Sequence, residues 1–112
     1  MDNDRKQQWI LKPVGSCQGK GIFMTNKPSE IPPKTQMVAC KYIDNPMLVN
    51  GLKFDLRVYV AITSINPLRI YIYDEGLARF ATHKYESIYS ANKANRYMHL
   101  TNYSVNKYSK EF

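Results

Sequence analysis

The stretch that most constrains the fold of this chain is Lys-Phe-Asp-Leu-Arg-Val-Tyr-Val-Ala-Ile at residues 53–62. Apolar and polar side chains alternate along it, which is typical of a β-strand, because successive side chains of a strand point to opposite faces. The apolar set is predicted to face the core and comprises Phe54, Leu56, Val58, Val60 and Ile62. The opposite face carries Lys53, Asp55, Arg57 and Tyr59. Exposed edge strands also carry such charges for solubility, so this face alone does not indicate a functional site.

The length and charge of the chain limit its class. A chain of 112 residues with 44% hydrophobic content is expected to form one small domain with a core. Sixteen Lys and Arg against nine Asp and Glu give a net charge of +7, which favours a nucleotide, a nucleic acid, an acidic protein or a membrane surface as partner. There is no secretory signal pattern and no apolar run long enough to span a bilayer. Cys17 and Cys40 are therefore expected to be reduced thiols of a cytosolic protein.

Short apolar runs bounded by turn residues predict further strands at residues 9–12, 22–25, 37–43, 68–73 and 77–82. The run at 37–43 is apolar enough to predict a central strand. Residues 28–31 predict one helical turn, which two prolines end. Turns at 64–67 and 74–76 predict that strands 53–62, 68–73 and 77–82 form an antiparallel meander. Residues 85–96 are predicted to be loop with a weak helical turn, and residues 103–112 give no clear element.

Three glycines punctuate the loop between the first two predicted strands, with the sequence Gly-Ser-Cys-Gln-Gly-Lys-Gly at residues 15–21. A Walker A loop or a dinucleotide-binding fingerprint would be followed by a helix, and here a strand follows. The backbone N–H groups of such a loop can still approach phosphate oxygens, with Lys20 close by. A flexible hairpin loop explains the same residues equally well, so both interpretations stay open.

Two histidines and one arginine also stand out. A lone histidine near apolar neighbours is usually structural, and His83 is interpreted in this way. His99 is more suggestive, because Thr101 and Asn102 follow it closely. Arg79 is interpreted as a solvated strand charge unless it faces the same cleft as Arg57.

Taken together, several motifs resemble those of the tubulin tyrosine ligase-like family, a group of ATP-grasp enzymes, in the family's order and spacing over residues 9–107. They are Trp-Ile-Leu-Lys-Pro at 9–13, the glycine loop, Lys-Tyr-Ile at 41–43, Lys-Phe-Asp-Leu-Arg at 53–57, Glu-Gly-Leu-Ala-Arg-Phe at 75–80 and Met-His-Leu-Thr-Asn-Tyr at 98–103. The last two are more similar to the glutamate-adding members than to the tyrosine ligase. The implied fold class is α+β and ATP-grasp-like, with mainly antiparallel sheet and few short helices.

The resemblance implies an ATP-dependent carboxylate–amine ligase, the parent protein of this chain. A tubulin glutamate carboxylate would be activated as an acyl-phosphate and attacked by the amine of free glutamate, with release of ADP and phosphate. The implied partners are tubulin, with its acidic tails, and free glutamate. The resemblance implies neither a nucleic-acid partner nor a membrane. The implied location is the cytoplasm and cytoskeleton, including a cilium, flagellum or basal body.

The resemblance also implies roles for individual residues. Lys12 would reach the nucleotide phosphates, and four loop residues would close over them: Gln18, Gly19, Lys20 and Gly21. The adenine would lie against Cys40, Lys41, Tyr42 and Ile43, with only a main-chain role for Cys40. Lys53 would contact the nucleotide and Asp55 the ribose hydroxyls. Arg57 and Arg79 would be catalytic, meeting the terminal phosphate and the developing acyl-phosphate. The same cleft would be lined by His99, Leu100, Thr101 and Asn102.

The metal ligands of the family are not found here. Mg²⁺ is expected in the parent protein, held by acidic residues and an asparagine beyond the His-Leu-Thr-Asn motif, but Glu111 is the only acid after Asn102. The prediction is a polar tail at 1–8 and a partial ATP-grasp domain at 9–112, truncated before the metal-binding segment and inactive alone. Two alternatives stay open: a non-catalytic nucleotide-binding relative, and a basic, tyrosine-rich RNA-binding module. An RNA-recognition sheet would present aromatics where Lys53, Asp55 and Arg57 stand.

Overall fold

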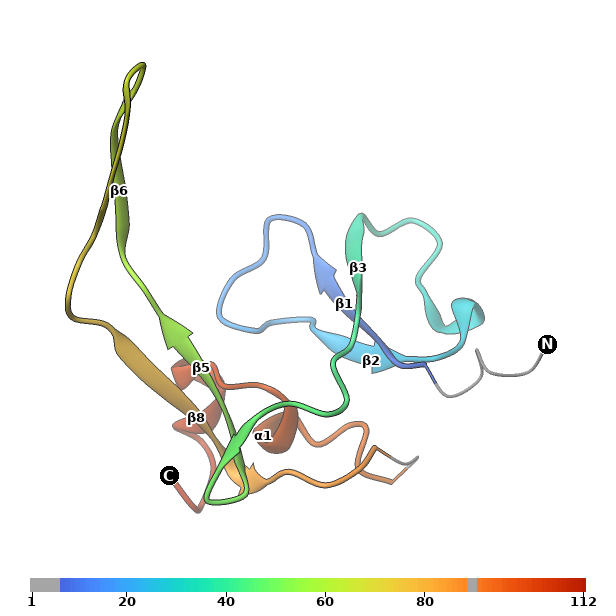
Figure 1. The fold of residues 1–112 in the computed structure, drawn as a ribbon. Helices are drawn as coiled ribbons and strands as arrows, with labels where there is room; N and C mark the ends of the chain where they lie inside the picture. The colour runs from blue at the N-terminus through green and yellow to red at the C-terminus, as the bar shows by residue number, and fades with distance from the viewer. Residues whose placement is uncertain (1–6, 89–90) are drawn as a thin grey trace.

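A computed structural model describes residues 7–88 and 91–112 of the chain (Figure 1). Antiparallel strands arranged in small sheets make up most of this part. Two short α-helices follow the strands, α1 (Arg96–His99) and α2 (Tyr103–Asn106). The predicted α+β class is therefore confirmed. No helix in the two described ranges has the length and apolar character needed to cross a membrane.

The first sheet has the strand order β2-β1-β3, with β1 (Trp9–Pro13), β2 (Phe23–Thr25) and β3 (Met37–Lys41). A single 3-10 turn (Pro28–Glu30) lies between β2 and β3, as predicted. The prediction that residues 37–43 form a central strand is wrong, because β1 is the central strand of this sheet. An apolar run shows neither which edges of a strand are paired nor whether its side chains are covered. Leu11 of β1 is 1% exposed, whereas Val38 of β3 is 52% exposed.

The second sheet has the order β4-β5-β8, with β4 (Leu48–Val49), β5 (Leu52–Arg57) and β8 (Leu77–Lys84). Asn50 and Gly51 join β4 to β5 with φ angles of 52° and 77°. Positive φ at both positions is what a tight two-residue hairpin turn requires, and Asn-Gly supplies it at low cost. The β5–β8 ladder places Asp55 opposite Arg79.

The predicted meander is wrong in its pairing. The stretch 53–62 divides at Val58 and Tyr59 into β5 and β6 (Val60–Ile65), and β6 pairs with β7 (Leu68–Ile72) rather than continuing the second sheet. Because β5 pairs with β8, these four strands form one long hairpin with two ladders. Residues 74–76 continue the hairpin instead of reversing it, and Gly76 is needed there because a Cβ would lie 2.6 Å from the carbonyl oxygen of Arg57.

The apolar side of residues 53–62 is not a core wall, which corrects a second expectation. Leu56 and Ile62 are 64% and 62% exposed, and the β6–β7 hairpin projects away from the rest of the molecule (Figure 1). Alternation shows which side chains share a face, but burial requires another layer against that face. Phe54 contacts the ring of Phe80, its cross-strand neighbour on β8 in the same sheet, at 5.8 Å between centroids.

The core is formed by residues of the first sheet, β8 and the two helices, and Asn106 links α2 to β8 and to the segment between the helices. This side chain is 1% exposed. Its Oδ1 accepts hydrogen bonds from the backbone N–H and the hydroxyl of Thr82, both at 3.0 Å. Its Nδ2 donates to the carbonyl oxygens of Leu100 at 2.7 Å and Asn102 at 3.1 Å. These four hydrogen bonds satisfy both donors and both acceptor sites of the buried amide, so Asn106 holds the motif at 99–102 against β8.

Candidate functional site

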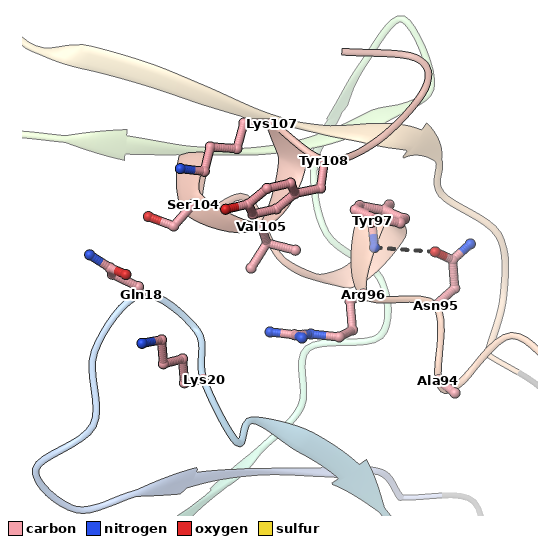
Figure 2. A pocket seen from close by; sticks show the side chains of 10 residues that line it. All are labelled: Gln18, Lys20, Ala94, Asn95, Arg96, Tyr97, Ser104, Val105, Lys107 and Tyr108. Carbon is pink, nitrogen blue, oxygen red and sulfur yellow. Dashed lines mark hydrogen bonds between the residues drawn. The ribbon is translucent and has the colours of Figure 1, made fainter.

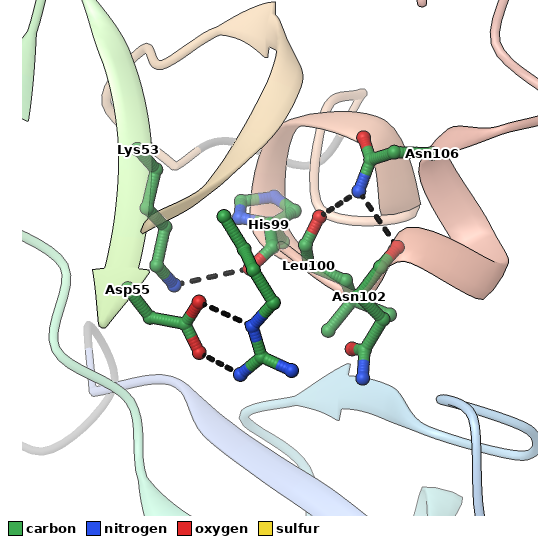
Figure 3. A network of polar contacts seen from close by, with 7 residues as sticks. Lys53, Asp55, His99, Leu100, Asn102 and Asn106 are labelled. Atoms are coloured by element: carbon green, nitrogen blue, oxygen red, sulfur yellow. Dashed lines mark hydrogen bonds and ion pairs between the residues drawn. The ribbon is translucent and has the colours of Figure 1, made fainter. Parts of the chain in front are cut away.

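The side chain of Lys53 extends from β5 toward Tyr42, the residue that follows β3. Its Nζ donates hydrogen bonds to the Tyr42 hydroxyl and to the carbonyl oxygen of His99, each at 3.0 Å, and Figure 3 shows the second of these contacts. Burial lowers the pKa of the Lys53 ammonium, and the charge of Lys12 lowers it further, while Asp55 opposes both effects. Lys12 and Lys53, from different sheets, therefore lie close enough to repel each other.

His99 is held at both ring nitrogens. Its Nδ1 lies 2.9 Å from the Tyr42 hydroxyl, and its Nε2 lies 3.1 Å from the carbonyl oxygen of Asn92. Because a carbonyl only accepts, Nε2 must carry the proton, and Nδ1 accepts from the phenol. Burial lowers the pKa of His99 and raises that of Tyr42, so both stay neutral. His99 therefore connects α1 to Tyr42, the residue that follows β3. Both of its ring nitrogens already have hydrogen-bond partners.

Asp55 and Arg79 form a bidentate pair across the β5–β8 ladder. Arg79 Nε donates to Asp55 Oδ1 at 2.8 Å, and Nη2 donates to Oδ2. Burial alone would raise the pKa of the Asp55 carboxyl, but the hydrogen bond and charge of Arg79 outweigh it, with Thr101 and Arg57 adding to them, so the pKa lies below its usual value. The hydrogen bond from Arg79 to Asp55 raises the pKa of the guanidinium. Lys53 and Asp55, two residues apart, thus point into the same region (Figure 3).

The structure separates the two predicted catalytic arginines. Arg79 is hydrogen-bonded to Asp55, while Arg57 lies two pairs further along the ladder, opposite Leu77. Arg57 is exposed and lines a different cavity with Gly76. The charge of Arg57 still contributes to the lowered pKa of Asp55, so both arginines act on one carboxylate.

The glycine loop folds back onto the helices. Arg96 Nη2 donates to the carbonyl oxygen of Gly19 at 2.6 Å, and Gly19 is buried. A Cβ at Gly19 would lie 3.0 Å from Cγ2 of Val105, so the loop backbone packs directly against α2. Gln18 and Lys20 therefore line a cavity between the loop and the helices (Figure 2), apart from the Asp55–Arg79 pair.

The remaining predicted residues serve different neighbours. In the adenine segment Tyr42 is buried, Cys40 is half-buried beside Ile10 in the ladder, and the side chains of Lys41 and Ile43 are exposed. Leu100 lines an apolar cavity of about 220 Å³ between the first sheet and α1. Thr101 faces a cavity of about 450 Å³ that Arg79 also lines. Asn102, the N-cap residue of α2, packs near Gly19. Gly21 packs against Pro13, where a Cβ would lie 2.8 Å from Cγ.

Sequence reasoning missed Arg96, Asn92 and Asn106, all of which hold the site together. The sequence carried one signal near Arg96, an asparagine that can cap a helix. Asn95 caps α1 by accepting a 3.2 Å hydrogen bond from the backbone N–H of Tyr97, and Arg96 begins that helix. No local pattern marks Asn92, whose carbonyl oxygen faces His99 Nε2, or Asn106, which is hydrogen-bonded to Thr82 and Leu100.

Across residues 7–88 and 91–112, no group of three or more His, Cys, Asp and Glu side chains is placed to hold a metal ion. The described residues therefore do not fit the Mg²⁺ set expected of the parent protein. By contrast, Lys12 and Lys53 fit a triphosphate, since two cations that repel each other gain from an anion between them.

Comparison with known proteins identifies the relatives of this chain. The model of the tubulin-tyrosine ligase family matches residues 1–112. The chain is 51% identical to human tubulin polyglutamylase TTLL13 over 108 residues, which is 96% of the chain and 13% of that protein. It is 50% identical to mouse tubulin polyglutamylase TTLL5 over 104 residues, 93% of the chain and 8% of that protein. Human tubulin polyglutamylase TTLL6 is 50% identical over 108 residues, 96% of the chain and 12% of that protein. The chain thus spans about a tenth of the length of these relatives.

Proposed function

Because this chain belongs to the tubulin-tyrosine ligase family, we propose that the protein which contains it is an ATP-dependent ligase that adds glutamate to glutamate residues of tubulin. The observation that carries this proposal is the cluster on β5, where Lys53 is held by two hydrogen bonds beside the Asp55–Arg79 pair. Three relatives that share about half of their aligned residues with this chain are named tubulin polyglutamylases. These names support tubulin as the proposed acceptor and glutamate as the amino acid that is added.

Lys12 and Lys53 are proposed to hold the phosphates of ATP. Lys53 already has two acceptors, Tyr42 and His99, and an ammonium has three donors, so one is left for a phosphate oxygen. Its lowered pKa reflects burial and the neighbouring Lys12, and the charges of a triphosphate would raise that pKa again. Partial burial of Lys53 also makes its interaction with a phosphate stronger than it would be in water.

Arg79 is proposed to stabilise the charge that develops during phosphoryl transfer, with Arg57 as the second guanidinium. The acceptor carboxylate attacks the terminal phosphorus, ADP leaves, and an acyl-phosphate forms. The amine of free glutamate then attacks the acyl carbon, loses a proton and expels phosphate, which leaves an amide bond. Positioned cations stabilise such a transition state more than water does because they need no reorganisation. The ion pair with Asp55 keeps Arg79 in one orientation before substrates arrive.

Partners and location follow from the proposed acceptor. Tubulin tails are acidic, and a chain with a net charge of +7 would be steered toward them, most strongly at low salt. The protein is accordingly proposed to act in the cytoplasm on microtubules, including those of a cilium, flagellum or basal body.

The test is transfer of radiolabelled glutamate to purified tubulin by the full-length protein with ATP and Mg²⁺. Label should enter tubulin only when ATP is present, and Lys53→Ala should bind ATP at least tenfold more weakly, whereas Lys34→Ala, an exposed lysine outside the cluster, should leave ATP binding unchanged. Tubulin that stays unlabelled with a protein that binds ATP would contradict the ligase assignment. Equal ATP affinity of the two variants would contradict the nucleotide site.

A further inference from the structure

Arg96 makes the one hydrogen bond that joins the glycine loop to a helix among the described residues. Its Nη2 donates to the carbonyl oxygen of Gly19 at 2.6 Å. In Figure 2 the guanidinium extends from α1 toward the loop residues Gln18 and Lys20. Neither of the ion pairs within the described ranges involves Arg96. The guanidinium is therefore held by a main-chain carbonyl of the loop rather than by a carboxylate.

The loop that Arg96 holds has a strained turn at its tip. The backbone N–H of Lys20 donates to the carbonyl oxygen of Cys17 at 3.1 Å. The two residues between them, Gln18 and Gly19, have φ angles of 58° and 74°. These are the features of a type I′ turn, which favours glycine or asparagine at its central positions. Glutamine is costly there because its Cβ crowds the backbone, so contacts from outside the loop are needed to maintain the turn.

Those contacts place the turn beside the Asp55–Arg79 pair. Gly19 is buried, and a Cβ at this position would lie 3.4 Å from Oδ1 of Asn102. Thr101, the residue before Asn102, interacts with the Asp55 carboxylate and lines a cavity together with Arg79. Two neighbouring residues thus contact the loop on one side and the ion pair on the other. The docked loop is therefore next to the proposed site of phosphoryl transfer.

The short helix α1 fastens both parts of the proposed phosphate site. Its first residue, Arg96, holds the loop. Its last residue, His99, is hydrogen-bonded to the Tyr42 hydroxyl, which also accepts from Lys53. Residues three apart lie on the same side of a helix, so both contacts leave α1 toward neighbouring regions. The side chain of Asn95 caps the start of this helix, which fixes the position from which Arg96 extends.

We propose that Arg96 is a positioning residue for ATP, which keeps the glycine loop docked so that backbone N–H groups of the loop meet the phosphates without first being ordered. Because ATP is taken as the ligand, this role of Arg96 rests on the proposed function. A loop that is already ordered loses less conformational freedom on binding than a mobile one. If loss of the hydrogen bond left the loop docked about one fifth of the time, the apparent Kd for ATP would rise about fivefold. Adenosine has no phosphates and would bind equally well in both cases.

The experiment compares the native full-length protein with Arg96→Gln and Lys93→Gln. Each variant loses one positive charge near the start of α1, but Lys93 is paired with Glu30 and not with the loop. Arg96→Gln should raise the Kd for ATP about fivefold and change the affinity for adenosine, measured by competition, less than about twofold. Lys93→Gln should change both less than about twofold. Without ATP, hydrogen–deuterium exchange over residues 15–21 should be faster in Arg96→Gln only. Thermal unfolding curves check that each variant is folded.

Arg96→Lys is the second variant, because lysine keeps the charge but lacks the guanidinium fork. It should also bind ATP more weakly than the native protein, with faster exchange in the loop. Native ATP affinity in Arg96→Lys would mean that charge, and not the hydrogen bond to Gly19, acts on ATP, and would overturn this role. Equal losses of affinity for ATP and adenosine would also overturn it, as would faster loop exchange with unchanged ATP affinity.

Glutamate transfer to tubulin, measured on the same samples, separates this role from the proposed function. ATP binding that depends on Arg96 in a protein without ATP-dependent glutamylation would overturn the ligase activity and leave the role of Arg96 standing. Glutamylation by a protein in which neither ATP affinity nor loop exchange depends on Arg96 would do the reverse.

Discussion

Tyr42 and His99, which are 57 residues apart in the chain, are joined by a hydrogen bond of 2.9 Å between the phenol oxygen and Nδ1. The same phenol accepts a hydrogen bond from Lys53. One side chain from the segment after β3 therefore positions both a cation of β5 and the end of α1. These contacts connect the two sheets, so they connect the stability of the fold to the position of the proposed phosphate-binding lysine.

Replacing Tyr42 by Phe should lower the free energy of unfolding by about 1–3 kcal/mol, because Nδ1 of His99 and one donor of Lys53 lose their partner in a buried region. Denaturant unfolding of the full-length protein measures this change. Tyr71→Phe is the control, since Tyr71 lies on the projecting hairpin and is 58% exposed. If both substitutions had equal effects, the hydrogen-bonded chain through Tyr42 would contribute nothing to stability.

Acidification should destabilise the protein through His99. Burial lowers the pKa of His99 below its ordinary value of 6.5. The unfolded state then binds more protons than the folded state, so the contribution of His99 to stability is complete above about pH 6.5 and is lost as the pH falls through the lowered pKa. Melting temperatures recorded from pH 7.5 to pH 5 should fall more steeply for the native protein than for His99→Gln. Parallel curves would show that this histidine does not titrate on unfolding.

Removing the guanidinium of Arg79 should abolish ligation while leaving the fold intact. Loss of one positioned cation from a phosphoryl-transfer site costs on the order of a hundredfold in rate, and Arg57→Ala is expected to act in the same way. Stability should change by less than about 1 kcal/mol, because the Asp55–Arg79 pair is partly exposed. Arg69→Ala on the exposed strand β7 serves as the control. Normal glutamylation by Arg79→Ala would refute its catalytic role.

Gly19 and Gly15 offer a matched test of loop docking. Both have positive φ angles, 74° and 75°, so alanine is strained by about 1–2 kcal/mol at either position. Only at Gly19 does the added Cβ meet a neighbour, Cγ2 of Val105 at 3.0 Å, while Gly15 faces open space. Gly19→Ala should therefore also undock the loop, which faster tryptic cleavage after Lys20 would report. Equal cleavage of the two variants would mean that the loop is not held by this contact.

The sequence alone determined the family, most strand positions and the groups that carry charge, because motif spacing and side-chain alternation are local properties of the chain. It placed Lys53 and Asp55 on one face of a strand, and the structure has them so. Tertiary structure alone decided that β5 pairs with β8, and thereby that Asp55 meets Arg79. Pairing depends on which distant segments meet, and the alternation of residues 53–62 contains no information on whether another layer covers its apolar side.

The same limit explains His99, Arg96 and Asn106. The resemblance to the family predicts that His99 lines the nucleotide cleft, and it assigns no role to Arg96 or Asn106. In the folded chain each is hydrogen-bonded to backbone groups outside its own helix: His99 to Asn92, Arg96 to Gly19, and Asn106 to Leu100 and Thr82. A backbone carbonyl or N–H is present at nearly every position, so no sequence pattern identifies the one that will satisfy a buried side chain. Only the packed arrangement selects it, because burial makes an unmade hydrogen bond costly.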